Sequence, residues 1–158
     1  MAACCFTGHR DLTDKEYDHA YSSVSHVIKD LYYNFGVTDF YVGGALGFDT
    51  VAADALIAAR EEGIPLKMIL AVPCSDQDKY WTVAAKRTYR RIMEKSDRIV
   101  ILNNEYYNGC MLERNRYMVD RSDFCVAFLR SSTIKGGTLY TIRYAQKMNK
   151  TVVNVCED

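Results

Sequence analysis

The hydrophobic residues of this chain fall into short, nearly continuous runs that alternate with longer segments of helical period. The runs predict strands at residues 2–7, 39–42, 66–72, 98–102, 124–129 and 151–155. Between them, apolar residues recur every three or four positions, which predicts helices at residues 13–35, 49–62, 82–95, 111–121 and 138–149. The first helix carries clear end signals, because Thr13 and Glu16 have the spacing of a capping box and Gly36 follows its last turn.

This alternation of strand and helix runs from one end of the chain to the other without a linker or repeat. Continuous apolar strands are typical of a parallel sheet that is covered by helices on both faces. We therefore predict a single domain over residues 1–158, an α/β doubly wound Rossmann-like domain with a mostly parallel sheet of about six strands. Right-handed crossovers then place all strand-to-helix loops at one edge of the sheet.

The composition is that of an ordinary globular protein, with 49% hydrophobic and 25% charged residues. Twenty basic and twenty acidic side chains cancel. A protein that coats nucleic acid usually has a basic excess, because it neutralises phosphates. We therefore expect nucleic acid to be an unlikely partner.

The six cysteines form no CxxC pair, and only one histidine, His9, lies near any of them in sequence, so we predict reduced thiols and no metal site. No run approaches the roughly 18 apolar residues of a membrane span. The first residues also lack the basic and apolar regions of a signal peptide. We expect a cytoplasmic protein without a membrane partner.

Ligands of such folds bind outside the carboxyl ends of the strands, so the loops that follow the strands are the candidate site. The loop after the first strand carries Gly8, His9 and Arg10. Glycine allows close backbone approach, and arginine offers a fork that suits phosphate. His9 could donate a hydrogen bond or act as an acid or base. A simple turn with two solvated side chains is the alternative.

Two glycine-rich loops strengthen this prediction. Gly43, Gly44 and Gly47 follow the second strand, and Gly136, Gly137 and Thr138 open the last helix. Backbone amides at a helix N-terminus suit a phosphate. Asp49 could bind a sugar hydroxyl or could simply be the N-cap of its helix. Thr138 could likewise be an ordinary N-cap.

Two further features remain open on the residues alone. The run Glu113–Arg116 opens a helix, and Arg114 is most simply part of a solvated charged face. Twelve tyrosines are present, and the pairs Tyr80–Trp81 and Tyr106–Tyr107 lie in or beside loops. These aromatic residues could line a pocket or a dimer contact, because aromatic residues favour interfaces.

Together these segments resemble the SLOG superfamily of DprA/LOG-like Rossmann domains, and its YpsA-like family most closely. The matching segments are 6–10, 43–49, 114–123 and 136–138. The resemblance implies a bacterial domain that binds a nucleotide or nucleotide-derived ligand, with Arg114 in the site. In the YpsA-like family it implies links to cell division and stress rather than an established enzymatic activity.

The resemblance fails at one position that matters for catalysis. LOG-type phosphoribohydrolases carry Pro-Gly-Gly-x-Gly-Thr-x-x-Glu, whose glutamate does the acid–base work. Here Thr141 stands at the matching position, and Gly136-Gly137-Thr138 lacks the intervening glycine. Asp49, Glu113 and Asp120 are possible replacements for the missing carboxylate. Whether the chain is an enzyme is therefore left open.

Three hypotheses follow from these observations. The first is a domain that binds or senses a nucleotide, ADP-ribose, NAD or a similar ligand, without LOG-type catalysis and with no certain cofactor. The second is an enzyme that cleaves the N-glycosidic bond of a nucleotide. The third is a regulatory protein that binds a partner and whose glycine loops are only structural. A homodimer is the default oligomeric state by base rates.

Overall fold

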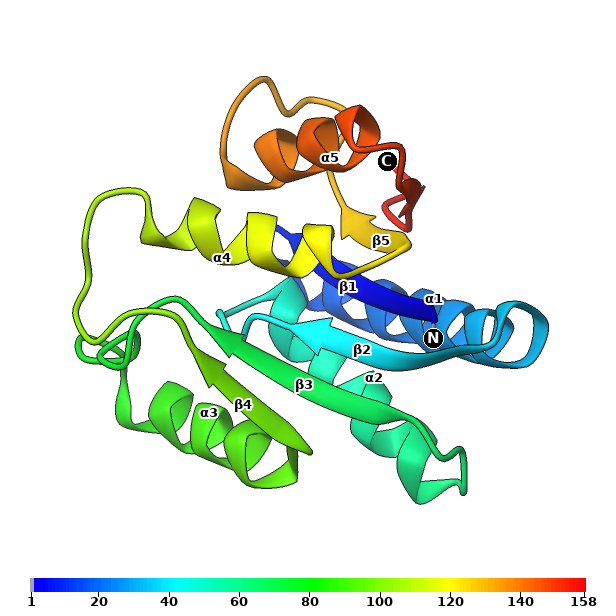
Figure 1. The fold of residues 1–158 in the computed structure, drawn as a ribbon, viewed down its shortest axis with the longest axis horizontal. Helices are drawn as coiled ribbons and strands as arrows, with labels where there is room; N and C mark the ends of the chain where they lie inside the picture. The colour runs from blue at the N-terminus through cyan, green and yellow to red at the C-terminus, as the bar shows by residue number, and fades with distance from the viewer. Residues whose placement is uncertain (1) are drawn as a thin grey trace.

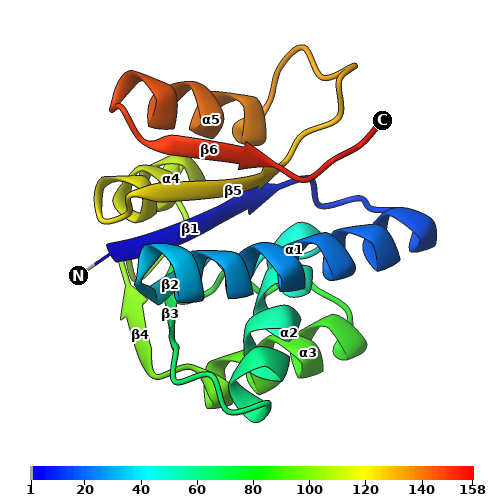
Figure 2. The same ribbon diagram turned by 90° about the vertical axis from the view of Figure 1, so that its right-hand side faces the viewer.

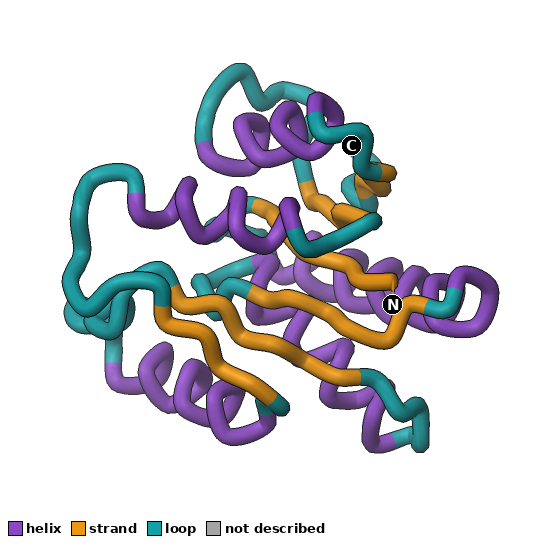
Figure 3. Tube along the Cα trace, viewed as in Figure 1, coloured by secondary structure: helices purple, strands orange, loops and turns teal. Residues whose placement is uncertain are grey.

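The computed structural model describes residues 2–158 and contains one sheet with helices on both sides (Figures 1 and 3). The strands are β1 (Ala2–Gly8), β2 (Val37–Val42), β3 (Lys67–Val72), β4 (Arg98–Ile101), β5 (Phe124–Phe128) and β6 (Thr151–Asn154). The helices are α1 (Asp14–Phe35), α2 (Phe48–Glu61), α3 (Val83–Lys95), α4 (Cys110–Asp120) and α5 (Gly137–Lys147). Each predicted element is present, with bounds that differ by at most two residues.

All six strands are parallel, in the order β4-β3-β2-β1-β5-β6. The chain moves outward from β1 to β4 and then returns through α4 to β5, on the other side of β1. The order therefore reverses between β1 and β5, which is the arrangement of a doubly wound sheet. This confirms the predicted fold class, and in sheets of this kind the crevice at the switch point lies at the carboxyl ends of the central strands.

The two faces of the sheet bury two separate clusters. On β1, Cys4 and Phe6 face the larger cluster, which α1, α2 and α3 cover, whereas Ala3 and Cys5 face the cluster under α4 and α5. Figure 2 shows α1 and α2 on one side of the strands and α4 and α5 on the other. Burial on both faces explains why the strands are continuous apolar runs.

Helix α1 begins and ends where its sequence signals predict. Thr13 is the N-cap, and its hydroxyl accepts from the amide of Glu16 while the Glu16 carboxylate accepts from the amide of Thr13. Gly36 ends the helix in the left-handed conformation at φ 68°. Its end signals are local, so tertiary contacts do not alter them.

The cysteines are free thiols, and five of the six are buried; Cys156 is partly exposed. Within residues 2–158, no helix has the length and apolar character that a membrane crossing requires.

Candidate functional site

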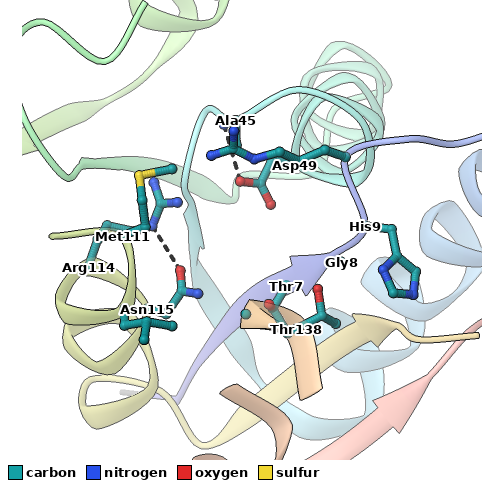
Figure 4. Close-up of a pocket in the computed structure, with 12 residues that line it drawn as sticks. Thr7, Gly8, His9, Ala45, Asp49, Met111, Arg114, Asn115 and Thr138 are labelled. Atoms are coloured by element: carbon teal, nitrogen blue, oxygen red, sulfur yellow. Dashed lines mark hydrogen bonds between the residues drawn. The ribbon is translucent and has the colours of Figure 1, made fainter. Parts of the chain in front are cut away.

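A polar cleft of about 250 Å³ lies at the carboxyl edge of the sheet, where the loops after β1 and β2 meet the first turns of α4 and α5 (Figure 4). Its lining residues are Thr7, Gly8, His9, Arg10, Ala45, Asp49, Met111, Leu112, Arg114, Asn115, Gly137 and Thr138. This is the edge at which ligands bind in doubly wound folds. The loop residues predicted from the sequence therefore converge in space.

The loops after β1 and β2 pack directly on each other because their glycines lack side chains. The amide of Phe48 donates to the carbonyl of His9 at 3.0 Å. A Cβ on Gly47, whose φ is 79°, would lie 2.4 Å from the carbonyl oxygen of Arg10, and a Cβ on Gly8 would lie 2.5 Å from the side chain of Phe48. Real Cβ atoms do not approach this closely. These two glycines thus serve the packing of the loops.

Arg114 is buried, with 3% of its surface exposed, and the solvated charged face considered for this helix is wrong at this position. Its Nη1 donates to the carbonyls of Gly43 at 2.6 Å and Ala71 at 3.2 Å. The guanidinium thus fixes the loop after β2 to the end of β3. The burial of Arg114 could not be predicted from its residue type, because arginine is rarely buried unless it is paired.

Asp49 supplies the charge that faces Arg114. It is 7% exposed, and its Oδ2 accepts from the amide of Ala45 at 3.2 Å. Burial raises the pKa of Asp49 and lowers the pKa of Arg114, and the attraction between the two charges opposes both shifts. Asp49 is not the N-cap, because α2 begins at Phe48 and Gly47 caps it without a side-chain bond.

A line of hydrogen bonds continues from Arg114 to α5. The Nε of Arg114 donates to Asn115 Oδ1 at 2.9 Å, and Asn115 Nδ2 donates to the hydroxyl of Thr141 at 2.9 Å. That hydroxyl donates to the carbonyl of Gly137 at 2.7 Å. Thr141, at the position of the LOG glutamate, therefore holds the start of α5 against α4.

The start of α5 faces the cleft through Gly137 and Thr138. Gly136 is the N-cap with φ 114°, and no side chain caps the helix, so Thr138 lies within the first turn. The first turn of α5 contains no acidic residue, so no carboxylate there offsets the positive end of the helix dipole, which is directed at the cleft.

His9 has a structural hydrogen bond. Its Nε2 accepts from the backbone amide of Arg130 at 3.1 Å and lies 3.3 Å from the hydroxyl of Thr133. Burial, followed by the positive charge of Arg130, lowers the pKa of His9. The ring is therefore neutral near pH 7 and fixes the loop after β5 to the loop after β1.

Arg10 differs from the other cations of the site. Its side chain is exposed, and no ion pair or side-chain hydrogen bond within residues 2–158 uses its guanidinium. It lines both the cleft and a second pocket of about 460 Å³, which also shares Met111. This second pocket, here called the annex, is lined in addition by Cys74, Asp76, Gln77, Lys79, Tyr80, Trp81 and Tyr106.

The structure brings together most of the residues predicted for the site. Those that line the cleft are Gly8, His9, Arg10, Asp49, Arg114, Gly137 and Thr138. Gly43, Gly44, Gly47 and Gly136 support it from outside its lining. Sequence reasoning did not identify Thr7, Ala45, Met111, Leu112 and Asn115. Asn115 could have been identified as a site residue, because it is a polar residue next to Arg114 near the start of a helix.

Only one of the three carboxylates considered for catalysis reaches the cleft. Asp49 lines it. Glu113 instead accepts from Asn103 Nδ2 at 3.2 Å and from the Tyr107 hydroxyl, and Asp120 accepts from the Tyr144 hydroxyl at 2.6 Å. Glu113 and Asp120 are therefore committed to structural contacts.

A doubly wound parallel sheet with glycine-rich loops at its carboxyl edge defines the class of Rossmann-like domains. The YpsA family model, described as the YspA SLOG family, matches residues 4–155. The chain belongs to this SLOG family, and the resemblance seen in its loops is confirmed.

Two proteins of Bacillus subtilis are similar to this chain. The SPbeta prophage-derived protein YoqJ is 31% identical over 133 residues, which cover 77% of this chain and 77% of that protein. The UPF0398 protein YpsA is 25% identical over 138 residues, which cover 84% of this chain and 76% of that protein.

A solved structure has the same fold. DNA processing protein A of Helicobacter pylori, described for its single-stranded DNA binding mode, superposes with a TM-score of 0.69 at 22% identity. The match covers 96% of this chain and 63% of that one, so this chain spans less than two thirds of the solved protein.

The expectation that nucleic acid is an unlikely partner is contradicted by this neighbour, because a protein of this fold binds single-stranded DNA. The physical reason is that net charge sums over the whole surface, whereas nucleic acid contacts one face of a protein. A chain whose charges cancel can still carry a basic face, and α3 contains Lys86, Arg87, Arg90 and Arg91.

Proposed function

We propose that the cleft binds a phosphorylated ribose compound, such as a nucleoside phosphate or ADP-ribose, and that the domain senses or holds this ligand. The observation that carries the proposal is the convergence of an uncapped helix start, an unpaired arginine and a buried aspartate in one cleft at the carboxyl edge of the sheet.

The phosphate has two sources of attraction in this arrangement. The first turn of α5 offers backbone amides, the Thr138 hydroxyl and the helix dipole. Arg10 offers a guanidinium that forms no ion pair within residues 2–158, so it can bind an anion without breaking another contact. Arg114 contributes positive charge to the wall but is held by the carbonyls of Gly43 and Ala71.

The sugar has one candidate acceptor. The Asp49 carboxylate lines the cleft, and a carboxylate at this edge of a doubly wound sheet suits a ribose hydroxyl. The hydrolase alternative has Asp49 as its only carboxylate in the lining, since Thr141 replaces the LOG glutamate. We therefore favour binding without LOG-type turnover.

A thermal-shift panel of AMP, ADP, ADP-ribose, NAD and inorganic phosphate tests the proposal. A ligand at 100 times its dissociation constant stabilises a one-site protein by about 2.7 kcal/mol, which raises the melting temperature of a domain of this size by roughly 5–10 °C. Arg10→Leu should weaken binding roughly 10- to 100-fold, because a hydrogen bond to a charged group is lost.

Arg98→Leu is the control, since it removes another exposed positive charge, from β4 and away from the cleft. Equal loss of affinity in both variants would show that the overall charge of the protein, and not a contact of Arg10, causes the effect. A flat panel with the wild-type protein would overturn the proposal.

Single-stranded DNA is a second candidate ligand, favoured by the solved neighbour and by a shallow basic groove along α3. Lys86, Arg87, Arg90 and Arg91 line this groove together with Glu94, and Arg91 also pairs with Asp54. Fluorescence anisotropy of a labelled oligonucleotide would test it. Binding through this groove should weaken with added salt and with Arg87→Leu plus Arg90→Leu; binding unchanged by both would exclude the groove.

A further inference from the structure

The annex adjoins the cleft at the side that faces β3. Arg10 and Met111 line both spaces, so the cleft and the annex meet at these two residues. The rest of the annex comes from the loop between β3 and α3, and from Tyr106 in the loop before α4.

Three aromatic residues, Tyr80, Trp81 and Tyr106, line the annex, and two of them are highly exposed to solvent. Tyr80 is 89% exposed and Tyr106 is 64% exposed. Trp81 packs edge-to-face on Tyr89 with ring centroids 5.3 Å apart, which fixes its ring beside the pocket. Exposed rings around a pocket offer faces on which a flat heterocycle can stack, and such stacking is a main source of affinity for nucleic-acid bases.

Polar atoms within the annex lack partners. Both amide atoms of Gln77 and the Oδ1 of Asp76 are buried without a hydrogen bond of ordinary geometry within residues 2–158. Gln77 is close enough to Tyr89, and Asp76 to Cys74, to affect the pKa values of those two groups. Such atoms are rare because each loses its hydration without compensation, so a specific instance calls for an explanation. An amide that donates and accepts, beside a carboxylate that only accepts, is complementary to the edge of a base with an amino group.

The volumes agree with this arrangement. The cleft alone, at about 250 Å³, falls below the roughly 300–1,000 Å³ of ordinary ligand pockets. The annex adds about 460 Å³, which brings the combined space into that range. The cleft alone is therefore small for a nucleotide, whereas the cleft and the annex together are large enough for one.

We propose that the annex is a nucleobase subsite, in which the base stacks against Tyr80 and Trp81 and Gln77 and Asp76 read an edge that carries an exocyclic amino group. This inference rests on the proposed function, because the phosphate and ribose of the same ligand occupy the cleft. It names the ligand class more narrowly: a nucleotide with an amino-bearing base such as adenine.

Calorimetric titrations with AMP, IMP and ribose 5-phosphate test the subsite. IMP places a carbonyl oxygen where AMP has its amino group, and the acceptor-only Asp76 carboxylate then repels it. We expect AMP to bind at least roughly tenfold more tightly than IMP or ribose 5-phosphate. Equal affinity for all three would overturn the subsite and leave the phosphate cleft intact; no binding of any would overturn both.

Two variants separate recognition from folding. Gln77→Leu keeps the shape and removes two unpartnered polar atoms, so the free protein should melt at the same or a higher temperature. Tyr80→Ala removes an exposed ring. Each should weaken AMP roughly fivefold or more and leave ribose 5-phosphate unchanged. Tyr33→Ala, which removes a 68% exposed ring from α1, is the control and should change neither.

The most decisive measurement is whether Gln77→Leu raises or lowers the melting temperature of the free protein. If Gln77 only supports the loop, Gln77→Leu lowers the melting temperature and weakens AMP and ribose 5-phosphate alike. That outcome would overturn the subsite, as would unchanged AMP affinity in both variants.

Discussion

Gly43 separates the buried charges of the site, and adding one methyl group there tests how tightly they are held. A Cβ on Gly43 would lie 2.6 Å from Arg114 Nη1 and 2.7 Å from Asp49 Oδ2. Its φ is outside the left-handed region, so Gly43→Ala introduces a steric conflict without backbone strain. Overpacking of this kind costs typically 1–3 kcal/mol.

The reduced freedom of the unfolded chain offsets about 0.4–1 kcal/mol of that cost. Moving Arg114 would also weaken its 2.6 Å hydrogen bond to the Gly43 carbonyl. We therefore expect Gly43→Ala to lower the free energy of unfolding by about 1–3 kcal/mol, or the melting temperature by roughly 2–10 °C.

Gly137→Ala is the matched control for stability. A Cβ there would meet only Leu112 Cδ2, at 3.9 Å, and the position lies at a helix start where alanine is favourable. Urea denaturation should show it at least as stable as the wild type. If Gly43→Ala is as stable as Gly137→Ala, the buried contact between Arg114, Asp49 and the loop is not as described.

Three further results are expected. Because burial lowers the pKa of His9, the unfolded chain binds a proton more readily than the folded protein as the pH falls below about 6.5. The urea midpoint of the wild type should therefore fall between pH 7 and pH 5, and that of His9→Gln should fall less. An equal fall in both proteins would refute the assignment. Thr141→Val should lower the free energy of unfolding by about 1–3 kcal/mol, since Asn115 and Gly137 lose a buried partner; an unchanged urea midpoint would contradict that role. A thiol reagent should modify Cys156 first and the other five cysteines only after unfolding, whereas rapid reaction of several thiols in the native state would show that the buried ones open.

The fold could be predicted from sequence because its signals are local. Parallel strands buried on both faces are continuous apolar runs, and the ends of α1 carry their own cap residues. The starts of α2 and α5 differed from the prediction by one residue, since glycine caps there leave no side-chain signal: Gly47 and Gly136 precede the first helical residue.

The site was only partly predictable, because proximity in space is not written in the sequence. Residues that directly follow strands, such as Gly8 and Arg10, were identified from topology. Arg114 was placed in the site by family resemblance, and its burial depends on carbonyls of Gly43 and Ala71 far away in the chain. Gln77 gave no signal, because a polar residue in a polar loop is noteworthy only once its burial is known.

Net charge was the least informative quantity. It led to the wrong expectation about nucleic acid, because a total of zero conceals the basic residues gathered on α3. The distribution of charge over faces requires the fold.

Titration of ¹⁵N-labelled protein with AMP, followed by amide chemical shifts, tests the central claim most directly. Binding in the cleft predicts the largest shifts at the amides of Gly8, Arg10, Gly137 and Thr138, which surround the proposed phosphate and ribose. Saturable shifts there would support the proposed ligand site. Shifts confined to α3, or no saturable shifts at millimolar AMP, would contradict it.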